Sequence, residues 1–117
     1  GKGRALLLAS KYPFRRLIGV EFARELVDAA RANLRQLQPR VELLCQDATE
    51  YVFPDGPLVI FLYNPFGAEV MRRVVQRAVQ APGPVWVMYL NPFEESCWTE
   101  AGFRRVANGP TFSILTR

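Results

Sequence analysis

Apolar and polar residues recur along the chain at spacings that predict three helices. Residues 4–11 are mostly strong helix formers and end shortly before Pro13, which favours a first short helix. A second helix is predicted over residues 22–37, because apolar side chains recur there on one face: Phe22, Leu26, Ala30, Leu34 and Leu37. A third is predicted over residues 69–81, with these side chains inward: Val70, Val74, Ala78 and Ala81.

Short apolar runs between the helices predict strands. Residues 16–20 and 41–45 flank the second helix, and residues 58–63 form the longest apolar run, which is typical of a central strand. Three further strands are predicted over residues 85–90, 103–107 and 111–116. A short turn joins the last two, so we expect them to pair antiparallel. This alternation predicts an α/β fold: a three-layer sandwich around a mostly parallel sheet that ends in an antiparallel pair.

Length and composition predict a single domain spanning residues 1–117. Half of the residues are apolar and 22% are charged, as is ordinary for a soluble globular protein. No apolar run reaches the roughly 18 residues of a membrane helix, and no signal-peptide pattern opens the chain, so we expect a cytoplasmic protein without a membrane partner. The cysteines, Cys45 and Cys97, follow neither a disulfide nor a zinc pattern, and histidine is absent.

The net charge of +4 comes mainly from arginines that are scattered along the sequence. A nucleic-acid-binding surface is expected to show a basic stripe with interleaved aromatic residues. The scatter instead favours solvated helix faces, although both interpretations stay open.

The candidate chemistry begins with a glycine-rich turn and a carboxylate. Gly1 and Gly3 precede the apolar run of residues 17–20, and Glu21 ends that run about 20 residues after the turn, a spacing typical of ribose binding in nucleotide sites. Glycine lets the backbone approach a ligand without a Cβ atom. Two further predicted strands are followed by polar residues, Asp47 and Asn64, at positions that face the same crevice.

Together these features resemble the class I S-adenosylmethionine-dependent methyltransferases. The resemblance spans essentially the whole chain and is closest to a group of bacterial predicted methyltransferases that share three motifs: Gly1-Lys2-Gly3-Arg4, Ile18-Gly19-Val20-Glu21 and Asn64-Pro65-Phe66. It implies a Rossmann-like fold, S-adenosylmethionine as the cofactor and a methyl acceptor that the sequence does not identify.

The resemblance also implies a role for each candidate residue. Glu21 would hold the ribose hydroxyls and Phe22 would pack against the adenine. Asp47 would accept a hydrogen bond from the adenine amino group, beside the backbone N–H of Ala48. The remaining cofactor residues would be Gly1 and Gly3 in the turn and Asn64, the candidate catalytic residue, under the sulfonium.

The sequence departs from the family pattern at its start. Only Gly1-x-Gly3 remains of the family's Gly-x-Gly-x-Gly turn, so the strand that precedes this turn is missing. The family's sheet order places that strand between residues 17–21 and 58–63, so we expect a gap there and further residues upstream in the functional protein.

Several alternatives remain at this point. Glu21 could be only a helix N-terminal acid, and Asp47 or Asn64 only turn residues. The chain could also be an NAD-binding Rossmann domain or a truncated, non-catalytic module. Methylases of amide and exocyclic nitrogens carry an Asn-Pro-Pro-aromatic motif that Asn64-Pro65-Phe66 matches in part, which favours a nitrogen acceptor. The oligomeric state is open.

Overall fold

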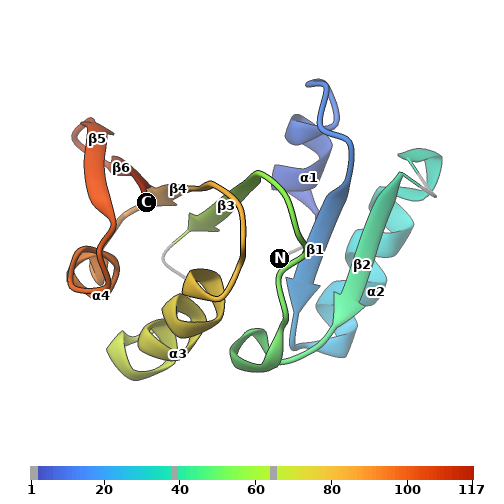
Figure 1. Ribbon diagram of the computed structural model, residues 1–117. Coiled ribbons are helices and arrows are strands. Elements are labelled where there is room, and N and C mark those ends of the chain that lie inside the picture. The colour runs from blue at the N-terminus through green and yellow to red at the C-terminus, as the bar shows by residue number, and fades with distance from the viewer. Residues whose placement is uncertain (1–2, 38–39, 64–65) are drawn as a thin grey trace. The chain divides into compact units, whose positions relative to one another are not determined.

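The computed structural model describes residues 3–37, 40–63 and 66–117, and the chain divides into two compact units (Figure 1). The first, Gly1–Ala48, contains α1 (Arg4–Ala9), β1 (Leu17–Glu21), α2 (Arg24–Asn33), the 3₁₀ turn η1 (Arg35–Leu37) and β2 (Val41–Cys45). A second 3₁₀ turn, η2 (Ala48–Glu50), begins at its end. The second unit, Thr49–Arg117, contains β3 (Leu58–Tyr63), α3 (Ala68–Val79), β4 (Val85–Leu90), α4 (Glu95–Thr99), β5 (Arg104–Asn108) and β6 (Phe112–Thr116).

In the first unit, β1 and β2 pair in parallel, with Leu17 opposite Val41. These two residues form a buried cluster with Leu34, which directly follows α2. Leu6 of α1 packs against the same cluster. Both helices therefore cover one face of the two-stranded sheet.

A glycine within β1 allows α1 to lie close to the sheet. A Cβ atom added at Gly19 would lie 2.7 Å from Cδ1 of Leu6 and 3.1 Å from Cδ2 of Leu43. Glycine inside a strand often marks such a close approach. Gly19 was not among the predicted functional residues, although a glycine inside a predicted strand was itself a signal of a close approach.

The second predicted helix is shorter than its apolar spacing suggested. Instead of spanning residues 22–37, α2 ends at Asn33 and is followed by η1. Phe22 lies before the helix and is 75% exposed, so its predicted place on the apolar face of this helix was wrong. Val27 is buried instead, together with Ala30.

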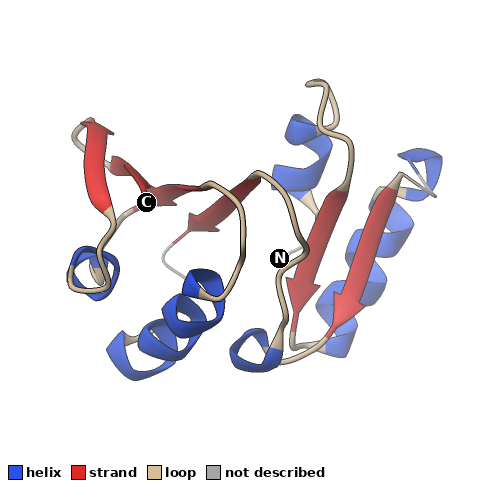
Figure 2. Ribbon diagram, viewed as in Figure 1, coloured by secondary structure: helices blue, strands red, loops and turns tan. Residues whose placement is uncertain are grey.

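In the second unit, the strand order is β3-β4-β6-β5 (Figure 2). β3 and β4 are parallel, whereas β6 pairs antiparallel with both β4 and β5. The predicted C-terminal antiparallel pair is therefore confirmed. Side chains alternate along the strands, and one face of the sheet is buried, with Ile60 and Leu62 from β3 and Val87 from β4.

The third predicted helix was placed correctly, but its inner face was partly wrong. α3 buries Met71, Val74, Val75 and Ala78. Val70 is 37% exposed, although the spacing predicted it inward.

The mixed α/β fold, with parallel strand pairs and a C-terminal antiparallel pair, is confirmed. Within the described residues, hydrogen bonds join β1 to β2 and β3 to β4, but no ladder joins β1 to β3. The two strand pairs therefore belong to separate sheets, one in each unit, and the expected gap between residues 17–21 and 58–63 stays a prediction. Of the helices in the described ranges, none is both long and apolar enough to cross a membrane, and the longest, α3, has 12 residues.

Candidate functional site

The parallel pairing of β1 and β2 brings two predicted site residues to the same end of the first unit. Glu21, the last residue of β1, lies opposite Cys45 at the end of β2. The ladder continues one step further, because the Gln46 N–H donates to the Glu21 carbonyl at 3.0 Å. Asp47 therefore follows directly beside the end of β1. In open α/β sheets, ligands bind outside the carboxyl ends of such strands.

The Glu21 carboxylate is oriented by the backbone that follows it. Its Oε2 atom accepts a hydrogen bond from the Ala23 N–H at 3.1 Å, and Ala23 is the N-cap residue of α2. Glu21 therefore does act as an acid at the N-terminus of a helix, which was the alternative role. The helix dipole favours the ionised form of its carboxyl group there. An ionised carboxylate can accept about four hydrogen bonds, so this role is compatible with ligand binding.

The Phe22 ring, which the resemblance assigned to the adenine, is largely exposed beside this carboxylate. Its exposed fraction is 75%, whereas its backbone is fixed by a hydrogen bond from the Cys45 thiol to the Phe22 carbonyl at 3.4 Å. Cys45 is exposed as well. The ring belongs to the surface at this end of the strands, where a planar ligand could stack on it.

Asp47 and Ala48 lie where β2 leads into η2. Both residues are half-buried, and Ala48 is the first residue of the 3₁₀ turn. The carboxylates of Glu21 and Asp47 therefore lie at the same end of the unit, one at the end of β1 and the other just after β2. Of the residues implied by the resemblance, the structure brings together Glu21, Phe22, Asp47 and Ala48.

Gly3 has a packing role that the sequence did not reveal. Its φ of 92° is left-handed, and it is the N-cap residue of α1. An added Cβ atom would lie 2.6 Å from Cδ1 of Leu34 and 3.3 Å from Cβ of Ala30. The need for glycine at this position is therefore explained by conformation and packing within the first unit, and cofactor contact stays a prediction.

Gly1 and Asn64, the other two predicted site residues, lie outside the described residues. In the ranges 3–37, 40–63 and 66–117, no group of three or more His, Cys, Asp or Glu side chains could hold a metal ion.

Comparison with known proteins shows which family the chain belongs to. Residues 1–82, more than half of the chain, match the family model described as a methyltransferase domain. No curated protein matches the sequence.

Similar solved structures cover nearly the whole chain. The PH0226 protein from Pyrococcus horikoshii OT3 is 14% identical with a TM-score of 0.71, over 99% of this chain and 76% of that one. The S-adenosylmethionine-dependent methyltransferase SibL is 17% identical with a TM-score of 0.70, over 99% of this chain and 47% of that one.

The [4+2]-cyclase SpnF is also similar, with 18% identity and a TM-score of 0.69, over 92% of this chain and 50% of that one. The chain thus spans about half the length of two of these proteins. These likenesses show a Rossmann-like methyltransferase fold, and the match over residues 1–82 shows that the chain belongs to the methyltransferase-domain family.

Proposed function

We propose that this chain binds S-adenosylmethionine at the carboxyl ends of β1 and β2 and serves methyl transfer to an acceptor. The observation that carries the proposal is the position of Glu21 and Asp47 at neighbouring strand ends in a chain of the methyltransferase family. The family membership favours this cofactor over NAD, the alternative that the sequence left open.

The residues at this end fit the chemistry of the adenosine part of the cofactor. A ribose offers two hydroxyl donors, and the Glu21 carboxylate, oriented by the Ala23 N–H, is an acceptor for both. The adenine amino group is a donor that Asp47 would accept, and a ring nitrogen would accept from the Ala48 N–H. The exposed Phe22 ring would cover one face of the base.

The bound cofactor would supply the activated methyl group, so the chain itself needs no strong acid, base or metal. Its residues would contribute by holding the nucleoside in a fixed orientation, which lowers the entropic part of the barrier. We propose a nitrogen acceptor held by Asn64, because Asn64-Pro65-Phe66 partly matches the motif of methylases that act on amino groups.

The likeness to a [4+2]-cyclase means that this fold does not by itself fix the reaction. Cofactor binding is therefore the first test. S-adenosylhomocysteine is titrated calorimetrically into the 117-residue chain. Glu21→Gln is expected to weaken binding about 10- to 100-fold, since it removes charge-assisted hydrogen bonds worth roughly 1.5–3 kcal/mol.

Asp28→Asn is the matched control. Asp28 is an exposed carboxylate on α2 whose only close cation is Arg31 at 3.7 Å among the ion pairs of the described residues, so its loss should leave the affinity unchanged. Absence of binding, or equal weakening by both variants, contradicts the proposal. Binding of NAD in place of S-adenosylhomocysteine would assign the site to a dinucleotide.

A further inference from the structure

A segment far from the candidate cofactor site combines exposed aromatic rings with positive charge. Residues 11–16, here called the 11–16 loop, connect α1 to β1, and all six are exposed: Lys11, Tyr12, Pro13, Phe14, Arg15 and Arg16. Tyr12 is 64% exposed and Phe14 39%. The Tyr12 ring buries little area within the unit, and the Phe14 ring, although more than half buried, still leaves part of its surface accessible beside it.

The backbone of this loop is held by a single side chain from another part of the sequence. The guanidinium of Arg40, which precedes β2, donates to the carbonyls of Ser10 at 2.6 Å, Tyr12 at 2.8 Å and Phe14 at 3.1 Å. The Phe14 N–H also donates to the Tyr12 carbonyl at 2.8 Å. Three carbonyls on one cation fix the loop, so the rings can meet a ligand without a large further loss of backbone entropy.

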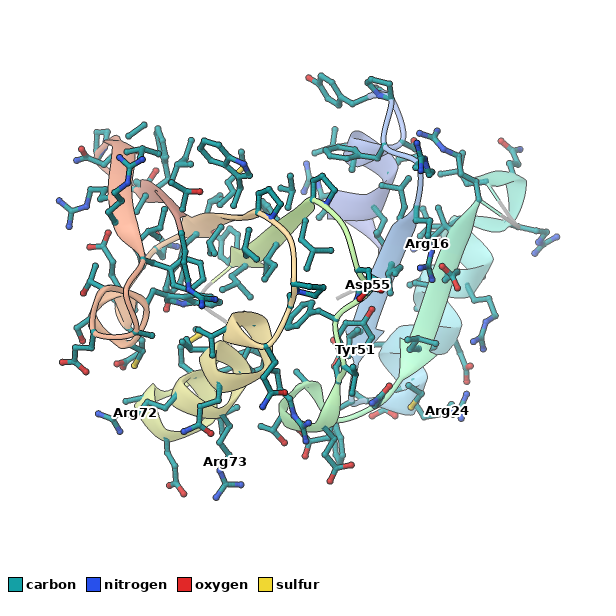
Figure 3. All side chains as sticks on the ribbon, viewed as in Figure 1. Arg16, Arg24, Tyr51, Asp55, Arg72 and Arg73 are labelled. Atoms are coloured by element: carbon teal, nitrogen blue, oxygen red, sulfur yellow. The ribbon has the colours of Figure 1, made fainter. Side chains whose placement is uncertain are left out.

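The fold also concentrates charge that the sequence had shown as scattered. Arg40 is brought to the loop that carries Lys11, Arg15 and Arg16. Arg16, which directly precedes β1 (Figure 3), forms an ion pair with Glu42 at 2.9 Å. Among the ion pairs of the described residues, Glu42 pairs with only one of these four cations, so the surplus at this end of the unit is positive.

The loop and the candidate cofactor site lie at opposite ends of β1. The loop precedes Leu17, the first residue of the strand, and Glu21 is the last. Four steps along a strand span roughly 13 Å. The loop is therefore separate from the site of the proposed function.

We propose that the 11–16 loop and Arg40 form a binding surface for single-stranded nucleic acid. Exposed bases would stack on the rings of Tyr12 and Phe14, while Lys11 and Arg15 would pair with the phosphates. Stacking on aromatic side chains combined with a cationic surface is how proteins bind single strands without sequence preference. Paired bases in a duplex do not offer their faces, so a duplex should bind more weakly.

An anionic membrane surface is the main competing partner for a basic and aromatic segment. Binding in the plane of a membrane is typical of amphipathic helices with a long apolar face. The 11–16 loop has only two aromatic side chains and no helix, and arginine, two of its cations, stacks well on bases. These features favour nucleic acid.

The test is fluorescence anisotropy of a labelled 12-nucleotide oligouridine with the full 117-residue chain, at 50 and 200 mM salt. Wild-type binding is expected to weaken as salt rises. The double variant Tyr12→Ala/Phe14→Ala should lose about 30-fold or more in affinity, because it removes both stacking contacts. Lys11→Gln/Arg15→Gln should weaken binding and reduce its salt dependence.

Two exposed residues of the second unit serve as matched controls. Phe93→Ala removes a ring that is 78% exposed, and Arg104→Gln removes an exposed cation on β5, so both should leave the affinity unchanged. Circular dichroism checks that each variant is folded.

Three results would overturn the proposal: no binding of the oligouridine, equal affinity of wild type and the aromatic double variant, or equal affinity for single strand and duplex. A fourth result would also overturn it: the chain binds vesicles that contain 30% phosphatidylserine, and the aromatic double variant weakens this vesicle binding but not the binding of oligouridine. That outcome would assign the loop to a membrane surface.

Discussion

At the scale of single residues, two independent features of the structure require glycine at position 3: the backbone conformation and the packing. Its backbone is left-handed, which L residues with a side chain adopt only at a cost, and the space where a Cβ would lie is filled by Leu34. Leu34 is 1% exposed and cannot move away easily. A glycine that looks like part of a nucleotide-binding turn is therefore also required by its close contact with the C-terminal end of α2.

Comparison with Gly56 separates the cost of the backbone conformation from the cost of packing. Its φ is 94°, but no atom lies within 4 Å of an added Cβ. Gly56→Ala should cost only the left-handed strain, about 1–2 kcal/mol. Gly3→Ala should cost a further 1–3 kcal/mol, roughly, for overpacking against Leu34. Urea denaturation of both variants measures the difference, and equal losses would show that Leu34 adapts.

At the scale of elements, the strands were easier to predict from the sequence than the helices. β2, β3 and β4 begin and end at the predicted residues, because each is an apolar run bounded by turn residues. The inner face of α3 was harder. Val70 and Met71 are adjacent and both apolar, and only the packing partners decide that Met71 is buried at 0% exposure.

The carboxylate of Glu95 connects the short helix α4 to the last two strands. Glu95 forms a bidentate pair with Arg105 of β5, with the Arg105 Nε at 2.8 Å from Oε1 and Nη2 on Oε2. The Arg105 guanidinium lowers the pKa of Glu95 below its ordinary 4.5. Desolvation opposes this shift, and a hydrogen bond with Ser113 of β6 adds to it.

This shift gives the second unit a pH-dependent contribution to stability. Because the folded pKa of Glu95 lies below 4.5, the contribution is complete above pH 4.5 and is lost as the pH falls through the lowered value. We expect Glu95→Gln to have a lower Tm than wild type at pH 7, and the Tm difference to shrink progressively as the pH falls below 4.5.

Glu69→Gln is the control for this prediction. Its pair with Arg73 is at 3.3 Å, but the Glu69 side chain is 82% exposed, so little stability should depend on it. A Tm difference for Glu95→Gln that is constant from pH 7 to 3 would contradict the role of the ion pair.

At the scale of the whole molecule, the sequence predicted the mixed α/β fold class. It also predicted polar residues at strand ends that face one crevice, and the structure brings Glu21 and Asp47 to the same end of the first unit, because parallel strands present their carboxyl ends together. It did not reveal that Arg40 holds the 11–16 loop, since contacts between residues so far apart leave no periodic signal. The roles of Gly1 and Asn64 stay predictions.

The sheet of the second unit has two apolar faces of different exposure. One is buried, whereas the other carries exposed Phe61 and Trp86. The protein has two tryptophans, and Trp98 is 0% exposed, in edge-to-face contact with Phe103 at 5.0 Å between ring centroids. Each tryptophan therefore reports on a different environment.

Fluorescence quenching by acrylamide distinguishes these environments. Trp98→Phe leaves Trp86, which is 44% exposed, so its emission should be red-shifted and strongly quenched. Trp86→Phe leaves Trp98, whose emission should be blue-shifted and protected. Equal protection of both would mean that the outer face of β3 and β4 is covered in solution.

The difference between the two cysteines makes the candidate cofactor site directly observable. Cys45 is exposed at the end of β2, and its thiol lies on the Phe22 carbonyl, whereas Cys97 is buried. Burial raises the pKa of the Cys97 thiol, which keeps it protonated and unreactive at neutral pH. A maleimide fluorophore would therefore attach at Cys45 in the wild-type chain, so the protein carries its own attachment point for a reporter beside Glu21.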